Sequence, residues 1–228
     1  MSQHPPAKLY DRLLTKQEVQ TFIECLEKAI LNPQTELQFM NPYTLLVATL
    51  LSAQATDVGV NRATNDLFKS VTTPQQMLDL GEEKLIEHIR TIGLFNTKAK
   101  NIMKGAQMLV EHHQGEVPQD REALERLPGV GRKTANVVLN IAFGHPTVAV
   151  DTHIFRVGNR TGLAPGKDPL AVELSLLKRL PKHSLMKAHH LLILHGRYHC
   201  KARTPLCATC PVQHVCRFKK KKATLITV

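Results

Sequence analysis

The sequence has no long hydrophobic run and no secretion signal. Its longest apolar run, YTLLVATLLSA, covers only residues 43–53, whereas a helix that crosses a bilayer needs roughly 20 such residues. The first residues, MSQHPPAKLYDRLLTK, are polar and contain no apolar core of signal-peptide length before a cleavage site. We therefore expect a soluble, cytoplasmic protein that has no membrane-spanning segment.

Segments that alternate apolar and polar residues, as a half-buried strand would, are also missing. Apolar residues recur instead at helical spacing, which predicts an all-α fold. Thr15 and Glu18 form a capping-box pair ahead of the first apolar stripe. We expect helices at about 16–31, 43–53, 57–70, 74–80, 82–91, 96–113, 120–126, 132–143, 152–161, 169–180 and 184–199.

Acidic residues are too few to balance the basic ones. The chain has 19 Asp and Glu against 30 Lys and Arg, a formal net charge of +11 and a pI near 9.6. Binding a polyanion relieves the self-repulsion of such a surface and releases the polyanion's counterions. Nucleic acid is the favoured partner, and an anionic membrane surface is the weaker alternative. The basic run RFKKKK at 217–222 is either a solvated tail or a phosphate contact.

Only five cysteines are present, and four of them fall in one short segment. Cys200, Cys207, Cys210 and Cys216 follow the spacing C-x6-C-x2-C-x5-C. In a reducing compartment this clustering indicates metal ligands rather than disulfides. Four thiolates suit either zinc or a [4Fe-4S] cluster, and chemistry alone leaves both open. Cys25, amid apolar residues of the first helix, is expected to fill the core.

A glycine-rich turn joins two predicted helices in LERLPGVGRKTANVVLN, residues 124–140. Gly129 and Gly131 let the backbone turn sharply and bring its N–H groups close to an anion at the start of the second helix. Arg132 lies at that start, where helices usually carry acidic residues. The segment predicts a clamp on a DNA backbone, and an ordinary corner between two helices is the alternative.

Lys133 follows in the first turn of this second helix. It lies on a different face from the apolar stripe of Ala135, Val138, Leu139 and Ala142. The positive helix end, neighbouring Arg132 and partial burial would each favour the uncharged amine. An uncharged lysine can attack an electrophilic carbon. Lys133 is therefore a candidate nucleophile, and a surface lysine that contacts phosphate is the alternative.

Asp151 opens another predicted helix in VAVDTHIFRVGNR, residues 148–160. Aspartate is a preferred N-cap, worth about 1 kcal/mol, and this structural role is the simplest explanation. A capping carboxylate also stays ionised, which suits a group that stabilises a developing cation. The two roles are compatible.

The motifs LPGVGRKTANVV and VAVDTHIFRV, with the cysteine spacing, resemble the endonuclease III family of the helix-hairpin-helix superfamily over about residues 15–218. Members of that family are bifunctional DNA glycosylases and abasic-site lyases. The resemblance implies two helical lobes with a cleft between them. One is a six-helix lobe at 35–146 that contains the hairpin, and the other is a discontinuous iron-sulfur lobe made of 1–34 and 147–228.

The resemblance also implies roles for single residues. Lys133 matches the Schiff-base nucleophile and Asp151 the catalytic carboxylate. Gln54 matches the residue that fills the gap left by an extruded nucleotide, and Leu94 matches the wedge beside it. Without the family, Gln54 would be a polar residue at a helix end and Leu94 a loop leucine in partial contact with the core.

The family further implies a [4Fe-4S] cluster on the four cysteines and base-excision repair as the function. Lys201 and Arg203, between the first two cysteines, would present positive charge to DNA phosphates. We expect removal of oxidised or ring-saturated pyrimidines from duplex DNA, followed by cleavage of the abasic site through β-elimination. The chain is expected to be a monomer associated with a bacterial nucleoid.

Three alternatives remain open. A monofunctional adenine glycosylase of the same superfamily would lack the lysine at position 133 and carry a second recognition domain, for which the residues from 217 to 228 leave no room. A non-catalytic DNA-binding module would use the hairpin as a clamp and the metal as a staple. An electron carrier would leave the net charge and the hairpin unexplained.

Overall fold

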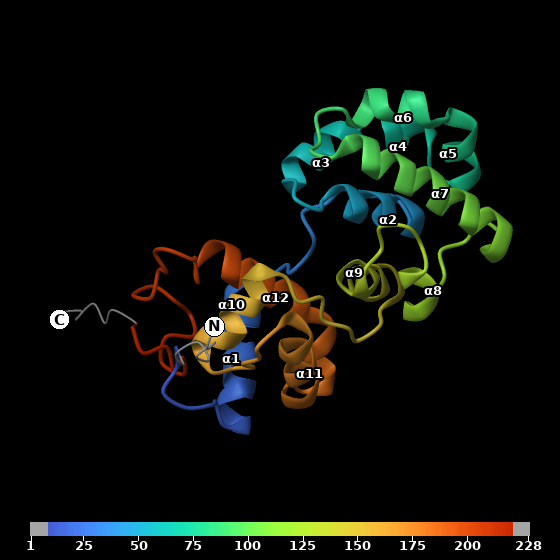
Figure 1. The fold of residues 1–228 in the computed structure, drawn as a ribbon. Helices are drawn as coiled ribbons and strands as arrows, with labels where there is room; N and C mark the ends of the chain where they lie inside the picture. The colour runs from blue at the N-terminus through green and yellow to red at the C-terminus, as the bar shows by residue number, and fades with distance from the viewer. Residues whose placement is uncertain (1–8, 221–228) are drawn as a thin grey trace, which may run out of the picture. The chain divides into compact units, whose positions relative to one another are not determined.

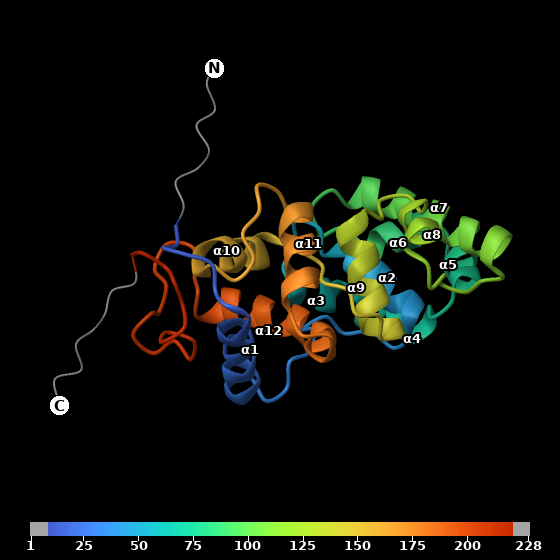
Figure 2. The same ribbon diagram turned by 90° about the horizontal axis from the view of Figure 1, so that it is seen from below.

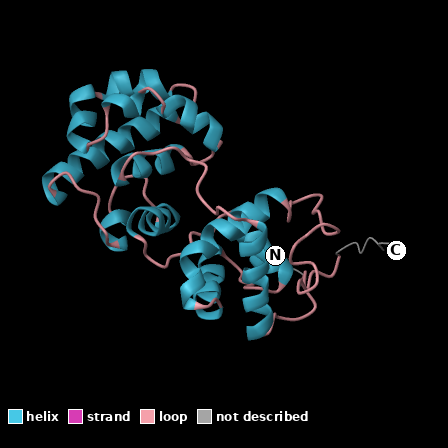
Figure 3. Ribbon diagram, turned by 180° about the vertical axis from the view of Figure 1, so that it is seen from behind, coloured by secondary structure: helices cyan, strands magenta, loops and turns pink. Residues whose placement is uncertain are grey.

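The computed structural model describes residues 9–220, and they form an all-helical chain. Within this range no strand forms, and one isolated bridge pairs Tyr10 with Phe218 (Figure 3). The predicted all-α fold is confirmed. Across the same residues, no helix combines the length and the apolar composition that crossing a membrane requires. The helices are α1 (Lys16–Ala29), α2 (Pro42–Leu51), α3 (Asp57–Thr64), α4 (Leu67–Ser70), α5 (Pro74–Leu80), α6 (Glu82–Ile89), α7 (Phe95–His113), α8 (Arg121–Glu125), α9 (Arg132–Phe143), α10 (Thr152–Thr161), α11 (Pro169–Arg179), the 3-10 helix η1 (Lys182–Ser184) and α12 (Leu185–Tyr198).

Contacts between Cα atoms divide the chain into two compact units. The hairpin unit is Thr35–His145 and contains helices α2 to α9. The cysteine unit combines Met1–Gln34 with Pro146–Val228 and contains the remaining helices. Each unit has its own hydrophobic core.

The hairpin unit is built around its longest helix, α7. Helices α5 and α6 pack against α7, and α2 packs against α9 (Figure 1). The buried face of α7 runs through Ile102, Ala106 and Leu109, at the spacing of a helical stripe. A capping box between Asn41 and Thr44 fixes the start of α2. The unit thus supplies a packed support for α8 and α9, which form the hairpin.

The cysteine unit is arranged around α12, which packs against α1 and α10 (Figure 2). Its core includes Phe22 from α1, Ile154 from α10 and Leu191 from α12, all fully buried. The predicted capping box of Thr15 and Glu18 is present at the start of α1. The core therefore joins a helix from the N-terminal part to two helices from the C-terminal part.

Most predicted helices begin and end within two residues of the observed ones, but the predicted helix at 57–70 is wrong. The chain forms α3 and α4 there, with Asn65 and Asp66 at the break. The side chain of Asn65 donates to Asp66, and Lys69 Nζ donates to the same carboxylate oxygen. Asparagine and aspartate both have low helix propensity, which agrees with an interruption at these two residues.

Candidate active site

The predicted hairpin forms between α8 and α9, and its two glycines have different surroundings. Gly129 has φ = +78°, and a Cβ there would lie 2.7 Å from Asn101 Nδ2 and 3.3 Å from Leu50 Cδ2. Only glycine suits a position that is both left-handed and this crowded. At Gly131, φ is −98°, and none of the described residues beyond its chain neighbours comes within 4 Å of a Cβ position. Packing inside the chain does not require Gly131, so its surface is open to a ligand.

Helix α9 is anchored on two faces. Its predicted apolar face packs into the core, as expected for Ala135, Val138, Leu139 and Ala142. Asn136 and Asn140, on the adjoining face, are buried as well. The side chain of Asn140 donates to the carbonyl of His145 at 3.2 Å. The helix is thereby held along its length, and its first turn is the part that reaches the surface.

The first turn of α9 is electropositive. It carries no acidic residue, and its N-cap, Gly131, has no side chain to cap the backbone amides. Arg132 and Lys133 add charge to the positive end of the helix dipole. The expected partial burial of Lys133 is wrong: although Asn136, one turn later on the same face, is buried, the side chain of Lys133 in the first turn is exposed.

Gln54 and Leu94 share an uncommon backbone conformation. Gln54, in the turn after α2, has φ = 57°, and Leu94, the N-cap of α7, has φ = 61°. Gln114 is the only other non-glycine residue with a positive φ among residues 9–220. A left-handed conformation costs a non-glycine residue about 1–2 kcal/mol. Gln54 is exposed and Leu94 is 62% exposed, which fits an inserted side chain better than a core contact.

Asp151 caps α10 as predicted. Its Oδ1 accepts a hydrogen bond from the Ile154 backbone N–H at 2.8 Å, and the residue is half-buried. A carboxylate offers two acceptor oxygens, and the cap engages Oδ1. The structural role is confirmed, and the catalytic role that the family implies stays a prediction compatible with it.

The four clustered cysteines line one cavity at the end of α12 and in the segment that follows. They are Cys200, Cys207, Cys210 and Cys216. All five cysteines are free thiols, so the described residues contain no disulfide. Burial raises the pKa of Cys200, which neighbouring Arg160 partly opposes, and burial raises the pKa of Cys210 to about 11. Metal binding requires thiolates, so a cluster here would bind with release of protons.

The donor set fits an iron-sulfur cluster. Four thiols line a shared cavity, and four cysteine thiolates are the ligands that a [4Fe-4S] cluster uses.

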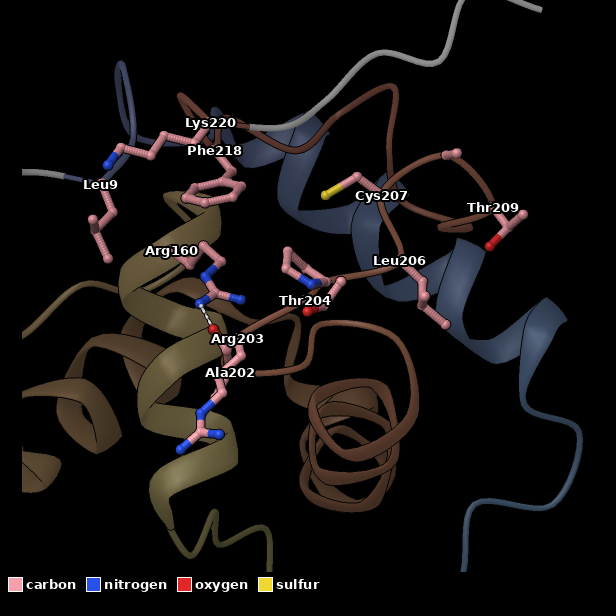
Figure 4. A pocket seen from close by; sticks show the side chains of 12 residues that line it. Leu9, Arg160, Ala202, Arg203, Thr204, Leu206, Cys207, Thr209, Phe218 and Lys220 are labelled. Atoms are coloured by element: carbon pink, nitrogen blue, oxygen red, sulfur yellow. Dashed lines mark hydrogen bonds between the residues drawn. The ribbon is translucent and has the colours of Figure 1, made fainter.

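Arg160 fastens the loop between the first two cysteines. From α10 its guanidinium donates to the carbonyl of Lys201 at 2.7 Å. It also donates to the carbonyl of Ala202 at 3.0 Å (Figure 4). It also donates to Sγ of Cys200 at 3.6 Å. A cavity of about 750 Å³ lies beside these contacts and is lined in part by Arg203. Lys201 and Arg203, the predicted DNA-contacting residues of the loop, are both exposed.

Known protein families match two successive parts of the chain. Residues 47–182 match the family described as HhH-GPD superfamily base excision DNA repair protein, and residues 200–216 match the iron-sulfur binding domain of endonuclease III. Endonuclease III from Haemophilus influenzae is 60% identical over 190 residues, which cover 83% of this chain and 90% of the relative. The chain belongs to the endonuclease III family.

Other relatives agree with this placement in the endonuclease III family. Endonuclease III from Escherichia coli K12 is 59% identical over 190 residues, again 83% of this chain and 90% of that protein. A trapped endonuclease III–DNA covalent intermediate, an estranged-adenine complex, superposes with a TM-score of 0.84 at 47% identity, covering 90% of this chain and 97% of the other. A thermostable thymine-DNA glycosylase shares the fold, with a TM-score of 0.80 at 23% identity and coverage of 90% and 98%.

Membership of the endonuclease III family also decides the cofactor. The match to the iron-sulfur binding domain begins at Cys200 and ends at Cys216. The cofactor is a [4Fe-4S] cluster, and zinc, which the spacing left open, is wrong.

Lys98 and Arg160, two residues that shape the site of this endonuclease III family member, were not identified from the sequence. Lys98 lies one turn before Ile102 on the buried face of α7, so the helical period does mark it as a charged residue in an apolar row. Arg160 lies near the end of α10. No motif distinguishes it from other surface arginines, because its role depends on a loop more than 40 residues later in the chain.

Proposed function

We propose that this chain removes oxidised or ring-saturated pyrimidines from duplex DNA and then cleaves the abasic site through a Schiff base on Lys133. The placement of Lys133 carries the proposal. It is an exposed amine in the first turn of a helix that follows a hairpin shaped by Gly129. A cation there gains nothing from the helix dipole, whereas it is well placed to meet DNA held by the same hairpin.

The hairpin would hold a DNA phosphate at the start of α9. The backbone around Gly131 is open, and a helix N-terminus beside Arg132 attracts anions. Lys201 and Arg203, on the loop that Arg160 fastens, would contact a further stretch of backbone. The net charge of +11 adds long-range attraction. The proposed partner is double-stranded DNA with a damaged pyrimidine or an abasic site, bound by a monomer.

Gln54 and Leu94 would occupy the space that an extruded nucleotide leaves. Both project from turns in left-handed conformations, and both are exposed. Extrusion costs a few kcal/mol, and least for a lesion that already stacks badly. Side chains that replace the lost stacking therefore favour extrusion at damaged sites.

Lys133 begins the chemistry as a nucleophile. Its Nζ forms a bond to C1′ of the sugar as the bond from C1′ to the base breaks, and the base leaves with that electron pair and takes up a proton. Asp151 stabilises the positive charge that develops on the sugar. The C1′–O4′ bond then breaks, O4′ keeps the electron pair and takes up a proton from solvent, and a protonated imine remains between Nζ and C1′. The imine acidifies the C2′ proton, and loss of that proton expels the 3′ phosphate by cleaving the C3′–O bond.

The [4Fe-4S] cluster, when bound, would supply a cross-link among Cys200, Cys207, Cys210 and Cys216. These thiolates would keep the segment 200–216 closed, so that Arg160 can hold the loop carbonyls of Lys201 and Ala202. In this proposal the four cysteines serve DNA binding and take no part in bond breaking.

A duplex that carries one thymine glycol tests the proposal. With borohydride present, the wild type should form a covalent protein–DNA adduct. Lys133→Gln should abolish the adduct, because an amide forms no imine. Lys104→Gln, which removes an exposed lysine of α7, is the matched control and should trap like the wild type. An adduct formed by Lys133→Gln would refute the assignment.

A duplex with a preformed abasic site separates catalysis from binding. The wild type should nick this duplex, whereas Lys133→Gln should bind it with similar affinity and leave it intact. If nicking and binding are lost together, Lys133 is a phosphate contact. If the wild type binds and does not nick, the chain is a non-catalytic DNA-binding module.

A further inference from the structure

A buried lysine joins the two strained turns of the hairpin unit. Lys98 lies on α7, one turn after Leu94, and is only 7% exposed. Its backbone N–H donates to the Leu94 carbonyl at 3.0 Å, the first helical hydrogen bond of α7. Its Nζ donates to the carbonyls of Leu51 at 2.9 Å and Ala53 at 2.7 Å. The side chain of Lys98 therefore ties the first turn of α7, which Leu94 precedes, to the carbonyl directly before Gln54.

The Lys98 ammonium has carbonyl partners and no acidic one. Among the described residues it forms no salt bridge, and burial lowers the pKa of Lys98. The two carbonyl contacts offset the desolvation of the ammonium. Leu51 is the last residue of α2, where helix carbonyls lack intrahelical partners and carry partial negative charge. A cation at this place stabilises the end of α2 and the turn that leads into Gln54.

Hydrogen bonds within the chain segment itself also support the turn after α2: the Ser52 backbone N–H donates to the Ala48 carbonyl at 2.9 Å, and Ser52 Oγ donates to the Thr49 carbonyl at 2.8 Å. The backbone N–H of Ala53 meets the Leu50 carbonyl at 3.4 Å, and that of Ala55 meets the Ser52 carbonyl at 3.1 Å. Both bonds are longer than those from Lys98. Left-handed non-glycine residues persist only where the surrounding structure holds them, and Lys98 supports Gln54 in its φ of 57° by two hydrogen bonds from another helix.

We propose that Lys98 is a positioning residue that holds Gln54 and Leu94 together in the conformation that enters the duplex. In this proposal Lys98 does not contact DNA itself; it is buried and supports the two turns through its hydrogen bonds. This inference rests on the proposed insertion of Gln54 and Leu94. Because both residues are fixed before DNA binds, less conformational entropy is lost on insertion.

Lys98→Met tests this role, because methionine keeps the apolar stem and removes the charge and the donors. Borohydride trapping is measured on an abasic-site duplex and on the same abasic strand without its complement. On the duplex the rate should fall by about tenfold, the factor that matches release of one left-handed residue. On the single strand, where no stack is entered, the rate should equal that of the wild type. Lys104→Met, on the exposed face of the same helix, is the matched control and should change neither rate.

A double-mutant cycle distinguishes positioning from general destabilisation. In a Gln54→Ala/Leu94→Ala background, Lys98→Met should cause no further loss on the duplex, because the residues that it positions are gone. A loss by the same factor in both backgrounds would overturn the proposal, as would an undiminished duplex rate for Lys98→Met alone. Should circular dichroism show that Lys98→Met is unfolded, Lys98→Gln replaces it in the same comparison, since its shorter amide reaches at most one carbonyl.

Failure of the proposed function has a different signature. A wild type that traps neither substrate lacks the lyase chemistry, and a Gln54→Ala/Leu94→Ala variant with the full duplex rate does not insert these residues. Either result overturns the positioning role together with the function on which it rests. The positioning role alone fails when the wild type traps both substrates, the insertion variant is slow, and Lys98→Met is not.

Discussion

Asp151 combines a structural task with a proposed chemical one on a single carboxylate. Its Oδ1 accepts the Ile154 N–H and so caps α10. Asparagine keeps an acceptor oxygen for the cap and loses the charge, whereas alanine loses both. The two substitutions therefore measure the cap and the charge separately.

Asp151→Asn should leave the free energy of unfolding within about 0.5 kcal/mol of the wild type, whereas Asp151→Ala should lower it by about 1 kcal/mol. Both variants should release base from a thymine glycol duplex about a hundredfold more slowly, because neither carries the charge that stabilises the developing cation. Thermal unfolding and single-turnover base release check these values. Equal base release by Asp151→Asn and the wild type would leave Asp151 with the capping role alone.

Residue types at motif positions were predictable from the sequence, whereas their surroundings were not. Lys133 was expected to be partly buried, but its side chain in the first turn of α9 is exposed. For Lys98, the helical period marks a buried position. It gives no sign of the Leu51 carbonyl that the lysine meets, which lies 47 residues earlier. Local patterns carry no information on such distant partners.

At the scale of helices, end signals were reliable because they are local. The capping box of Thr15 and Glu18 is in place because a cap is decided within four residues. The failure at 57–70 has the opposite cause. The apolar spacing continues through the break, and the low helix propensity of Asn65 and Asp66 is not part of that periodicity.

The two glycines of the hairpin between α8 and α9 should respond differently to the same substitution. Gly129→Ala puts a methyl group 2.7 Å from Asn101 and forces a left-handed alanine, so it should destabilise the fold by roughly 1–3 kcal/mol. Gly131→Ala meets no described residue and should cost less than about 1 kcal/mol. It should nevertheless weaken duplex binding, because its methyl group stands where a phosphate would approach α9.

Urea denaturation measures the two stabilities, and titration of an abasic-site duplex measures the affinities. Undiminished duplex affinity for Gly131→Ala would contradict a phosphate site at the start of α9.

For the whole molecule, the excess of basic residues should appear in the salt dependence of binding. The run RFKKKK at 217–222 is part of this excess, and its last two residues lie outside the described range. Truncation after Phe218 should make the slope of log affinity against log salt shallower by up to about 0.9 for each lysine that contacts a phosphate. Fluorescence anisotropy with an undamaged duplex, between about 50 and 200 mM salt, measures the slope. Equal slopes would assign the run to solvent.

The fold class of the whole molecule followed from helical periodicity, but the packing partners did not. Nothing in the spacing of α5 indicates that it lies against α7, because that contact depends on the intervening turns. The cofactor was likewise beyond the spacing of the cysteines, since four thiolates ligate zinc or iron. Similarity to endonuclease III decided between them.

Gly129 rests against Leu50 of α2 and Asn101 of α7. The end of α2 leads into Gln54, and the start of α7 is capped by Leu94. Helices α2 and α7 therefore support both the hairpin, which is proposed to bind the DNA backbone, and the turns that carry Gln54 and Leu94. We expect a larger side chain at position 101 to displace both the hairpin and the turns that carry Gln54 and Leu94, and so to alter DNA recognition.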